Sequence, residues 1–533
     1  MNVGGRALVV GLLAAAPAWA DASSPPLRLH LSEYASSAWH LDNGNIAPPT
    51  DVINYDPTGS NYGDWINRLQ ADASWRELTA QLRLDSALFA NVPVAAPGDA
   101  RMEGLLQHRY GDRADLEKAS LGYTTPHLEV TLGDSYVTFG RGLVLALRKV
   151  DELGIDTTAR GLSATARAAG FTLQGLAGLS NIVNVDPASG RTAADPDDRI
   201  FGGRAQYRLG RWLVPGADVA RIDAADGSDH VTAFSATLEA PHLGDYGTFY
   251  VEYARQLRSS DPPEVAGRRS ALYASGSAYL GRATLTVEYK DYRQFEPVAT
   301  SLSQLDYPEL ALTDFYNAPP TLERVQQPVL DNQDVAGPHA RLSVRVNDHV
   351  VPYLSMAVFE DRTYHTHIYD PYAGTELRWD EGRSRASLSS GFRLDRYDAN
   401  GPFAGLPLET DLHVEYDVNQ HLAGPYSVEL DGLHMTRGER QGQLLAHWLE
   451  GQAYLSFKKA DAWAVALGYE YYTATPATTR SSYVNANLMW QARSDLLLRL
   501  FVGGQRGGIK CVNGVCRDYP AFDGARLEVV AKY

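Results

Sequence analysis

The chain has few cysteines, no excess of positive charge and no long apolar helix. Two cysteines, Cys511 and Cys516, occur in 533 residues, which excludes a disulfide-rich scaffold. Acidic residues outnumber basic ones by 64 to 48, and the formal net charge is −16 at pH 7. Such a chain cannot neutralise phosphates along its surface, so no nucleic-acid partner is expected. Beyond the N-terminus, no segment approaches the roughly 18 consecutive apolar residues of a transmembrane helix.

Local signatures of catalysis and cofactor binding are also missing. The sequence contains no G-x-S-x-G or H-E-x-x-H motif, no phosphate loop and no dinucleotide fingerprint. A Ser–His pair assembled across strands would leave no such signature. The missing motifs therefore count against an enzyme without excluding a catalytic site of that kind. His365 and His367, like the acidic stretch 195–199, are interpreted as polar loop residues because further ligands cannot be identified. No catalytic residue, metal site or cofactor is predicted.

The N-terminus has the layout of a secretory signal peptide. Arg6 precedes an apolar stretch from Ala7 to Ala16, and Ala18-Trp19-Ala20 forms a small-x-small cleavage site. The apolar stretch is too short to cross a bilayer. We therefore expect residues 1–20 to be removed during export from the cytoplasm, leaving a mature chain of residues 21–533.

Alternation of apolar and polar residues recurs in segments of about ten residues, the length of a tilted membrane strand. In 463–472, Val465 and Leu467 face one side while Gly468 and Glu470 face the other. The same period occurs at 283–292, 340–348 and 408–418. Because lipid offers no hydrogen-bond partners, a closed barrel is the structure that such strands can form in a membrane.

Connections between these segments alternate between very short turns and longer polar loops. The longer connections are 36–63, 90–113, 180–198, 257–268, 292–337, 397–406 and 437–446. Short turns on the periplasmic side and long extracellular loops are typical of outer-membrane barrels. The sequence therefore predicts an all-β fold: one large transmembrane antiparallel β-barrel of about 24 strands, within a range of 22 to 26. An even number places both termini in the periplasm.

The last segment, 525–533, carries an outward apolar row that includes Leu527 and Val529 and ends at Tyr533. This row resembles the C-terminal signal that barrel assembly machinery recognises. We therefore expect the partners of the chain to include this machinery and the lipid of the outer membrane of a Gram-negative bacterium.

Residues 134–161 interrupt the alternation. Gly140-Arg141-Gly142 and an apolar run are followed by a dense cluster of charges. If this stretch enters the lumen, it forms a constriction or latch. The alternative is an external loop with solvated charges. The candidate constriction residues are Arg141, Arg148, Lys149, Asp151, Glu152 and Arg160.

Three local motifs resemble an uncharacterised domain-of-unknown-function family of large bacterial outer-membrane β-barrel proteins. They are FGRGL with LRKVDELGIDTT (139–158), YNAPPTLER (316–324) and QRGGIKCVNGVCR (505–517). The resemblance implies a barrel over most of the mature chain. It brings no activity, substrate or site residue.

The two cysteines flank Asn513-Gly514, which is a strong signal for a two-residue hairpin turn. That turn places Cys511 opposite Cys516, within disulfide range. We expect the pair to form a disulfide at the tip of an extracellular hairpin between the last two strands. Its small ring gains little chain entropy, so the bridge would mainly stabilise the tip.

Charges of both signs are predicted on the lumen face, among them Lys290, Arg393, Glu288, Asp411 and Glu470. A polar lumen of mixed charge favours a channel or transporter for a small solute, or a surface scaffold. An adhesin or assembly partner acting through its long loops fits the sequence as well. An outer-membrane enzyme and a secreted multi-domain β protein are further alternatives.

Overall fold

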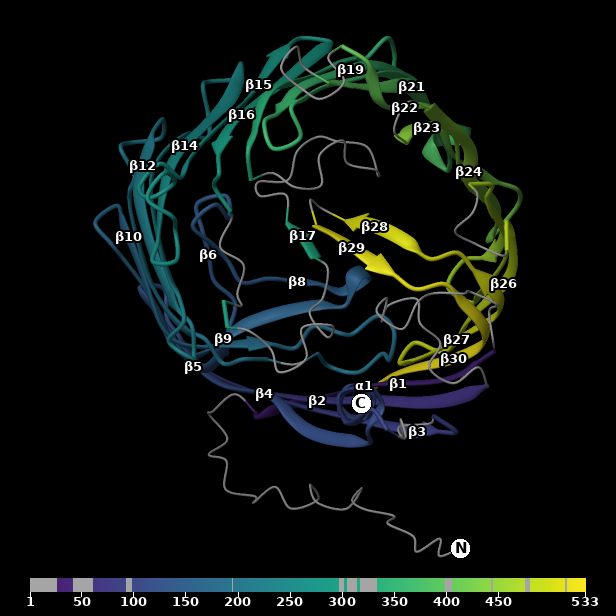
Figure 1. Ribbon diagram of the computed structural model, residues 1–533, viewed down its shortest axis with the longest axis horizontal. Coiled ribbons are helices and arrows are strands. Elements are labelled where there is room, and N and C mark those ends of the chain that lie inside the picture. Colours follow the sequence, from purple (N-terminus) through teal and green to yellow (C-terminus); the bar gives the residue numbers. More distant parts are fainter. Residues whose placement is uncertain are drawn as a thin grey trace, which may run out of the picture.

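The computed structural model describes residues 26–41, 61–92, 98–193, 195–296, 302–303, 314–316, 333–397, 405–441, 444–474, 480–512 and 515–533. The predicted signal peptide and most of the YNAPPTLER motif lie outside these ranges. Figure 1 shows the strands arranged as a ring seen along its axis, with several short elements inside the ring.

The wall is a closed antiparallel barrel of 24 strands, which confirms the predicted fold class and strand number. The main sheet contains 25 strands, and one of these, the two-residue β8 (Lys149–Val150), pairs with the beginning of β9 inside the ring. The wall strands are β1 (Arg28–His40), β2 (Tyr62–Trp75), β3 (Leu78–Ala90), β4 (Arg113–Thr124), β5 (Leu128–Ser135), β9 (Ile155–Ala168), β10 (Phe171–Ile182), β11 (Arg199–Tyr207), β12 (Val214–Asp223), β13 (His230–Ala240), β14 (Gly247–Arg258), β15 (Ser270–Leu280), β16 (Ala283–Arg293), β18 (Val335–Val344), β19 (Val350–Asp361), β20 (Thr366–Trp379), β21 (Ser384–Tyr397), β22 (Pro407–His421), β23 (Tyr426–Gln441), β24 (Leu444–Lys459), β25 (Trp463–Tyr472), β26 (Ser482–Arg493), β27 (Leu496–Gln505) and β30 (Phe522–Lys532).

The barrel closes where the first wall strand meets the last. β1 pairs with β30 from Ser32↔Lys532 to His40↔Gly524. Tyr533 also exchanges backbone hydrogen bonds with Leu31, at 2.7 and 3.1 Å. Because β1 begins opposite the end of β2, at the short turn before β3, both chain ends of the barrel lie on its short-turn side.

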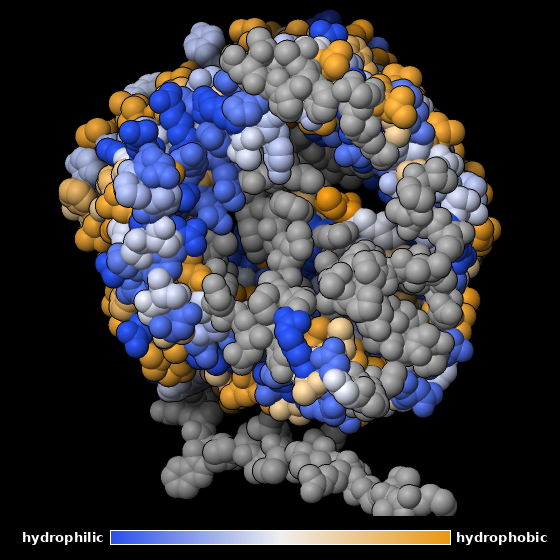
Figure 2. Space-filling model, viewed as in Figure 1, coloured by the Kyte–Doolittle hydropathy of each residue, from blue (hydrophilic) through white to orange (hydrophobic). Residues whose placement is uncertain are grey.

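The alternation places apolar side chains outside and charged ones inside. In β3, Leu82 and Leu84 are 51% and 49% exposed, while Arg83 and Asp85, which alternate with them, are each 8% exposed. The same inversion occurs in β25, where Leu467 is exposed and Glu470 is buried. Figure 2 shows hydrophobic residues around the outer circumference of the ring. This arrangement suits a wall surrounded by lipid. In the predicted outward row of the last strand, Leu527 and Tyr533 are exposed and Val529 is half-buried.

The turns and loops follow the predicted asymmetry with one exception. Ala169 and Gly170 both have positive φ (49° and 85°), the geometry of the tight hairpins that match strand twist. The predicted loop 437–446 is wrong, because β23 and β24 continue their ladder to Gln441↔Leu444. This end of the ladder lies on the long-loop side, where strand residues need not be apolar.

One helix lies within the predicted loop 90–113. α1 (Ala100–Tyr110) begins after Asp99, whose side chain accepts a hydrogen bond from the backbone N–H of Met102 at 2.9 Å. Leu105, Leu106 and Tyr110 are buried. Among the described residues, no helix has the length and apolarity needed to span a bilayer.

Candidate functional site

The segment between β5 and β9, residues 136–154, folds into the ring. It contains β6 (Thr138–Phe139), β7 (Leu145–Ala146), β8 and a 3₁₀ turn, η1 (Asp151–Leu153). Its apolar side chains from Val137 to Leu147 form one buried cluster with inward residues of the wall from β9 to β20. Figure 1 shows β6 and β8 inside the ring. The structure therefore gives the inward arrangement of this segment, and it occupies one side of the lumen.

Gly140 fixes the approach of this segment to the wall. Its φ is 57°, and a Cβ at this position would lie 2.4 Å from Oε1 of Glu252. The next residue, Arg141, donates its backbone N–H to Oε2 of Glu252 at 3.0 Å. Its guanidinium lies over the ring of Tyr250, 4.5 Å from the centroid. The fully buried Glu252 thus anchors the segment to β14.

The predicted constriction residues divide into separate places. Lys149, Asp151 and Glu152 line the main cavity, and Lys149 pairs with Asp151 at 2.7 Å. Arg160 instead lies in β9, where it pairs with Asp134 at 3.5 Å. Arg148 is half-buried, and Arg141 lies against β14. The six residues do not form one charge cluster, and three of them face the cavity.

The cysteine hairpin also folds into the ring. β28 (Gly508–Val512) and β29 (Val515–Tyr519) form a three-stranded sheet with β17 (Asp314–Tyr316). Figure 1 shows this sheet in the interior of the ring. The hairpin leaves the wall on the long-loop side, where the sequence placed it, but it folds inward against residues 153–154 and 185 and does not project outward. A hairpin pattern specifies local pairing, but the packing of Arg517 and Tyr519 decides the direction in which the hairpin folds.

Arg517 in β29 joins the hairpin to two other inward segments. Its side chain is 1% exposed. It donates hydrogen bonds to the backbone oxygens of Leu153 at 2.9 Å, Gly154 at 3.4 Å and Val185 at 2.7 Å. A buried guanidinium needs several acceptors, and here three backbone oxygens supply them.

The hairpin register places Cys511 directly opposite Cys516, as predicted. Cys516 is 1% exposed. The turn residues Asn513 and Gly514 lie outside the described residues. The backbone is compatible with a disulfide, and the bond itself stays a prediction.

Loop 183–198 is held by a buried ion pair with α1. Arg109 contacts Asp186 through Nε at 2.7 Å and Nη2 at 2.9 Å. Ser189 donates to the same carboxylate at 2.7 Å. Burial by itself would raise the pKa of Asp186, but the charge and hydrogen bonds of Arg109 outweigh it and hold the pKa below its usual value. The loop therefore depends on an ionised Asp186.

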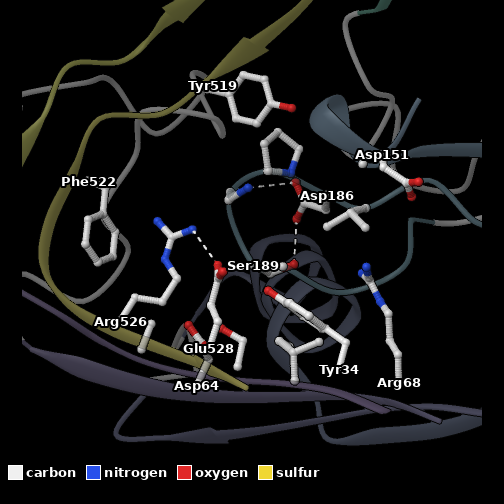
Figure 3. Close-up of a pocket in the computed structure, with 18 of the residues that line it drawn as sticks. Tyr34, Asp64, Arg68, Asp151, Asp186, Ser189, Tyr519, Phe522, Arg526 and Glu528 are labelled. Carbon is white, nitrogen blue, oxygen red and sulfur yellow. Dashed lines mark hydrogen bonds and ion pairs between the residues drawn. The ribbon is translucent and has the colours of Figure 1, made fainter. Parts of the chain in front are cut away.

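A cavity of about 980 Å³ lies between these inward segments and the wall. The wall side is formed by β30, β1 and β2, and the opposite side by residues 149–156 and 183–190. In Figure 3, Arg68, Arg526 and Tyr34 rise from the wall into this space, and Asp151, Asp186 and Ser189 lie across from them. The lining residues extend along the wall from Lys532, at one end of the β1–β30 ladder, to His40, at the other end.

A charge network that the sequence did not reveal supports the base of the inward segment. Asp156 accepts hydrogen bonds from Arg83 at 2.7 Å and from Tyr136 at 2.6 Å, and it also pairs with Lys118. Arg83 binds Asp85 through Nε at 2.8 Å and Nη2 at 2.6 Å. These residues come from β3, β4, β9 and the inward segment, so no local spacing marks them.

A second chain of buried polar groups crosses β16, β18 and β19. Nδ1 of His339 lies 3.4 Å from Glu288, and Nε2 lies 2.8 Å from Oγ of Ser355. The order carboxylate–imidazole–hydroxyl is that of a hydrolytic triad. Ser355 is 0% exposed, however, so a substrate has no access to its hydroxyl in this conformation. The group acts as a hydrogen-bonded support within the wall.

His365 and His367, interpreted from the sequence as polar loop residues, lie near the turn between β19 and β20. His365 lies in an exposed turn with a φ of 54°, and His367 pairs in register with Glu360. In the part of the chain that the structure describes, no group of three or more His, Cys, Asp or Glu side chains could hold a metal ion.

The fold and the cavity define a transmembrane β-barrel with inward-folded segments. No protein-family model and no curated protein sequence matches the chain, and the resemblance to a family of unknown function stays a prediction. Among solved structures, the siderophore receptor PirA from Pseudomonas aeruginosa aligns with a TM-score of 0.45 and 10% identity, over 96% of this chain and 81% of its own. The translocation pore of the P pilus usher PapC gives a TM-score of 0.43 and 8% identity, over 95% of this chain and 99% of its own. The ferric enterobactin receptor PfeA from Pseudomonas aeruginosa, in complex with enterobactin, gives a TM-score of 0.47 and 9% identity, over 95% of this chain and 81% of its own.

These likenesses say nothing about what this chain binds or transports. At such identities and TM-scores, the architecture rests on the strand ladder of the chain itself.

Proposed function

We propose that the protein is an integral barrel of the outer membrane of a Gram-negative bacterium that passes small polar solutes through its inner cavity. The proposal rests on the cavity along β30, β1 and β2. This cavity follows the β1–β30 ladder along the wall, from Lys532 at one end to His40 at the other. A barrel of 24 strands without inner segments would enclose a wide lumen. The inward segments reduce this space to a narrower passage with polar side chains of both signs.

The proposed export and membrane insertion of the chain rest on residues 1–20 and on β30. Residues 1–20 direct export, and the outward row of β30, with Leu527, Val529 and Tyr533, is presented to the barrel assembly machinery. Outer-membrane lipid then surrounds the exposed apolar side chains. Fractionation of cells, with heat-modifiable migration in detergent gels, tests this part, and recovery in the soluble periplasm would contradict it.

Planar-bilayer conductance of the purified protein tests the channel. We expect a small conductance from the wild-type chain. A variant in which 137–147 is replaced by a short Gly-Ser linker should conduct several-fold more, because its apolar cluster no longer fills the lumen. Heat-modifiable migration of the variant shows whether the wall has formed. If neither protein opens a pore, the channel proposal fails and a surface scaffold acting through the long loops becomes the better account.

A further inference from the structure

Four cations follow one another along the wall of the cavity. The cross-strand register defines successive inward rows on β27, β30, β1 and β2. Arg526 lies in the row of Ala38, Arg499 in the row of Ser36, Arg68 in the row of Tyr34 and Lys532 in the row of Ser32. Rows are two residues apart, which is about 7 Å along a strand. We call these four residues the cation ladder, and all of them line the cavity.

Two cations of the ladder, Arg68 and Arg526, are held less firmly than other arginines nearby. Arg83 and Arg109 are held by two short contacts each to one carboxylate. Arg68 in contrast has one ion-pair contact among the described residues, from Nε to Asp85 at 3.3 Å without hydrogen-bond geometry, and its guanidinium lies 5.7 Å from the ring centroid of Tyr34. Arg526 reaches Glu528 at 3.9 Å, and its guanidinium lies 4.8 Å from the ring centroid of Phe522. Long single contacts of this kind contribute little, so a ligand carboxylate can replace them.

Exposed acids face the ladder from the inward segment. Asp151 has a side chain that is 75% exposed, and Glu152 beside it is also exposed. The pair between Lys149 and Asp151 is at the surface, where such pairs contribute about 0 to 1 kcal/mol. In Figure 3, Asp151 lies across the cavity from the wall that carries Arg68 and Arg526. The inward segment therefore places two exposed acids opposite the cation ladder, while Glu528 and Asp64 on the wall and Lys149 on the inward segment add charges of the other sign to each side.

We infer that the cavity selects small zwitterions, molecules of the amino-acid class that carry one carboxylate and one ammonium group. The inference rests on the proposed channel function and names its substrate. The carboxylate moves along the ladder while the ammonium group faces Asp151 and Glu152. A simple anion is attracted by the ladder but repelled by the facing acids. A neutral sugar gains from neither side.

Swelling of proteoliposomes that contain the full-length protein tests this selectivity. The probes are L-glutamine, the neutral pentose L-arabinose and sodium gluconate. We expect glutamine to enter several-fold faster than arabinose through the wild-type protein. In the double variant Arg68→Gln and Arg526→Gln, the glutamine rate should fall roughly tenfold because charge-assisted hydrogen bonds are lost. The arabinose rate should stay the same.

A complementary variant and a control complete the test. Asp151→Asn with Glu152→Gln should slow glutamine and speed gluconate, since the repelling acids are gone. Arg493→Gln removes a charge from a turn outside the cavity and should change no rate. Equal wild-type rates for glutamine and arabinose, or a gluconate rate above both, would overturn the zwitterion inference while leaving the channel intact. Entry of no probe at all would instead overturn the channel proposal.

Discussion

The guanidinium of Arg517 donates to the backbone oxygen of Leu153 at 2.9 Å, although the two residues are 364 positions apart in the chain. This contact connects the cysteine hairpin near the C-terminus to the segment that fills the lumen. The inward elements therefore form one packed body and are not independent loops.

Replacing Arg517 by Ala should loosen this body without opening the wall. Hydrogen bonds from a charged group contribute about 1.5 to 3 kcal/mol each, so a loss of several kcal/mol in local stability is expected. Bilayer recordings should show a larger and noisier conductance, while heat-modifiable migration stays that of the wild type. Arg493→Ala is the matched control. An unchanged conductance would mean that Arg517 does not hold the inward segments in place.

Gly140→Ala should displace the inward segment from β14. The new Cβ would meet Glu252 at 2.4 Å, and the φ of 57° is strained for alanine. Gly210→Ala is a close control, because Gly210 has a φ of 60° but no atom of the described residues lies within 4 Å of the added Cβ. We expect a conductance increase at position 140 only. Equal effects at both positions would assign the change to backbone strain and not to the clash.

Acid should release loop 183–198 through Asp186. The pKa of this carboxyl is lowered in the folded chain, so its contribution to stability is complete above its unfolded pKa of about 3.9. That contribution disappears as the pH falls through the lower folded pKa. Proteolysis of the loop should therefore rise below about pH 4 in the wild type. Asp186→Asn should be sensitive already at pH 7, while Asp461→Asn, in an exposed turn, should behave like the wild type.

Ser355 should be structural and not catalytic. Ser355→Ala leaves His339 without its hydroxyl partner in a buried site, which costs about 1 to 3 kcal/mol. The thermal transition between the two gel forms should fall by a few degrees, with solute passage unchanged. A fluorophosphonate probe should label neither protein. Labelling that is lost in Ser355→Ala would reveal an enzyme.

The cysteine pair can be tested by thiol labelling. We expect maleimide to label the denatured protein only after reduction, because Cys511 and Cys516 face each other in the hairpin register. Cys516→Ser should leave one thiol that reacts without reduction. Labelling of the unreduced wild-type chain at two sites would exclude the disulfide.

The wall was predictable from the sequence because each strand carries its own evidence. In β25, the contrast between Leu467 and Glu470 already separates the lipid side from the lumen side. The number of such segments gave the size of the barrel. The predicted loop at 437–446 was wrong for a related reason. Strand residues that extend beyond the membrane need no apolar row, so the alternation that identifies a strand is missing there.

The interior was not predictable in this way. Arg517 contacts Val185, and Arg109 contacts Asp186, across distances of 332 and 77 residues. Such pairs arise from packing between segments and leave no periodic pattern. The charges of 134–161 did suggest an inward segment, but the residues that line the cavity with it come from both ends of the chain.

The cation ladder lies on the seam where β1 and β30 meet, so the passage cannot exist before the barrel closes. Arg526 and Lys532 belong to β30, which closes the barrel against β1, and Arg68 belongs to β2. A chain that stops short of β30 has neither a sealed wall nor a complete ladder. The pairing of β1 with β30 therefore seals the wall and forms the passage in one step.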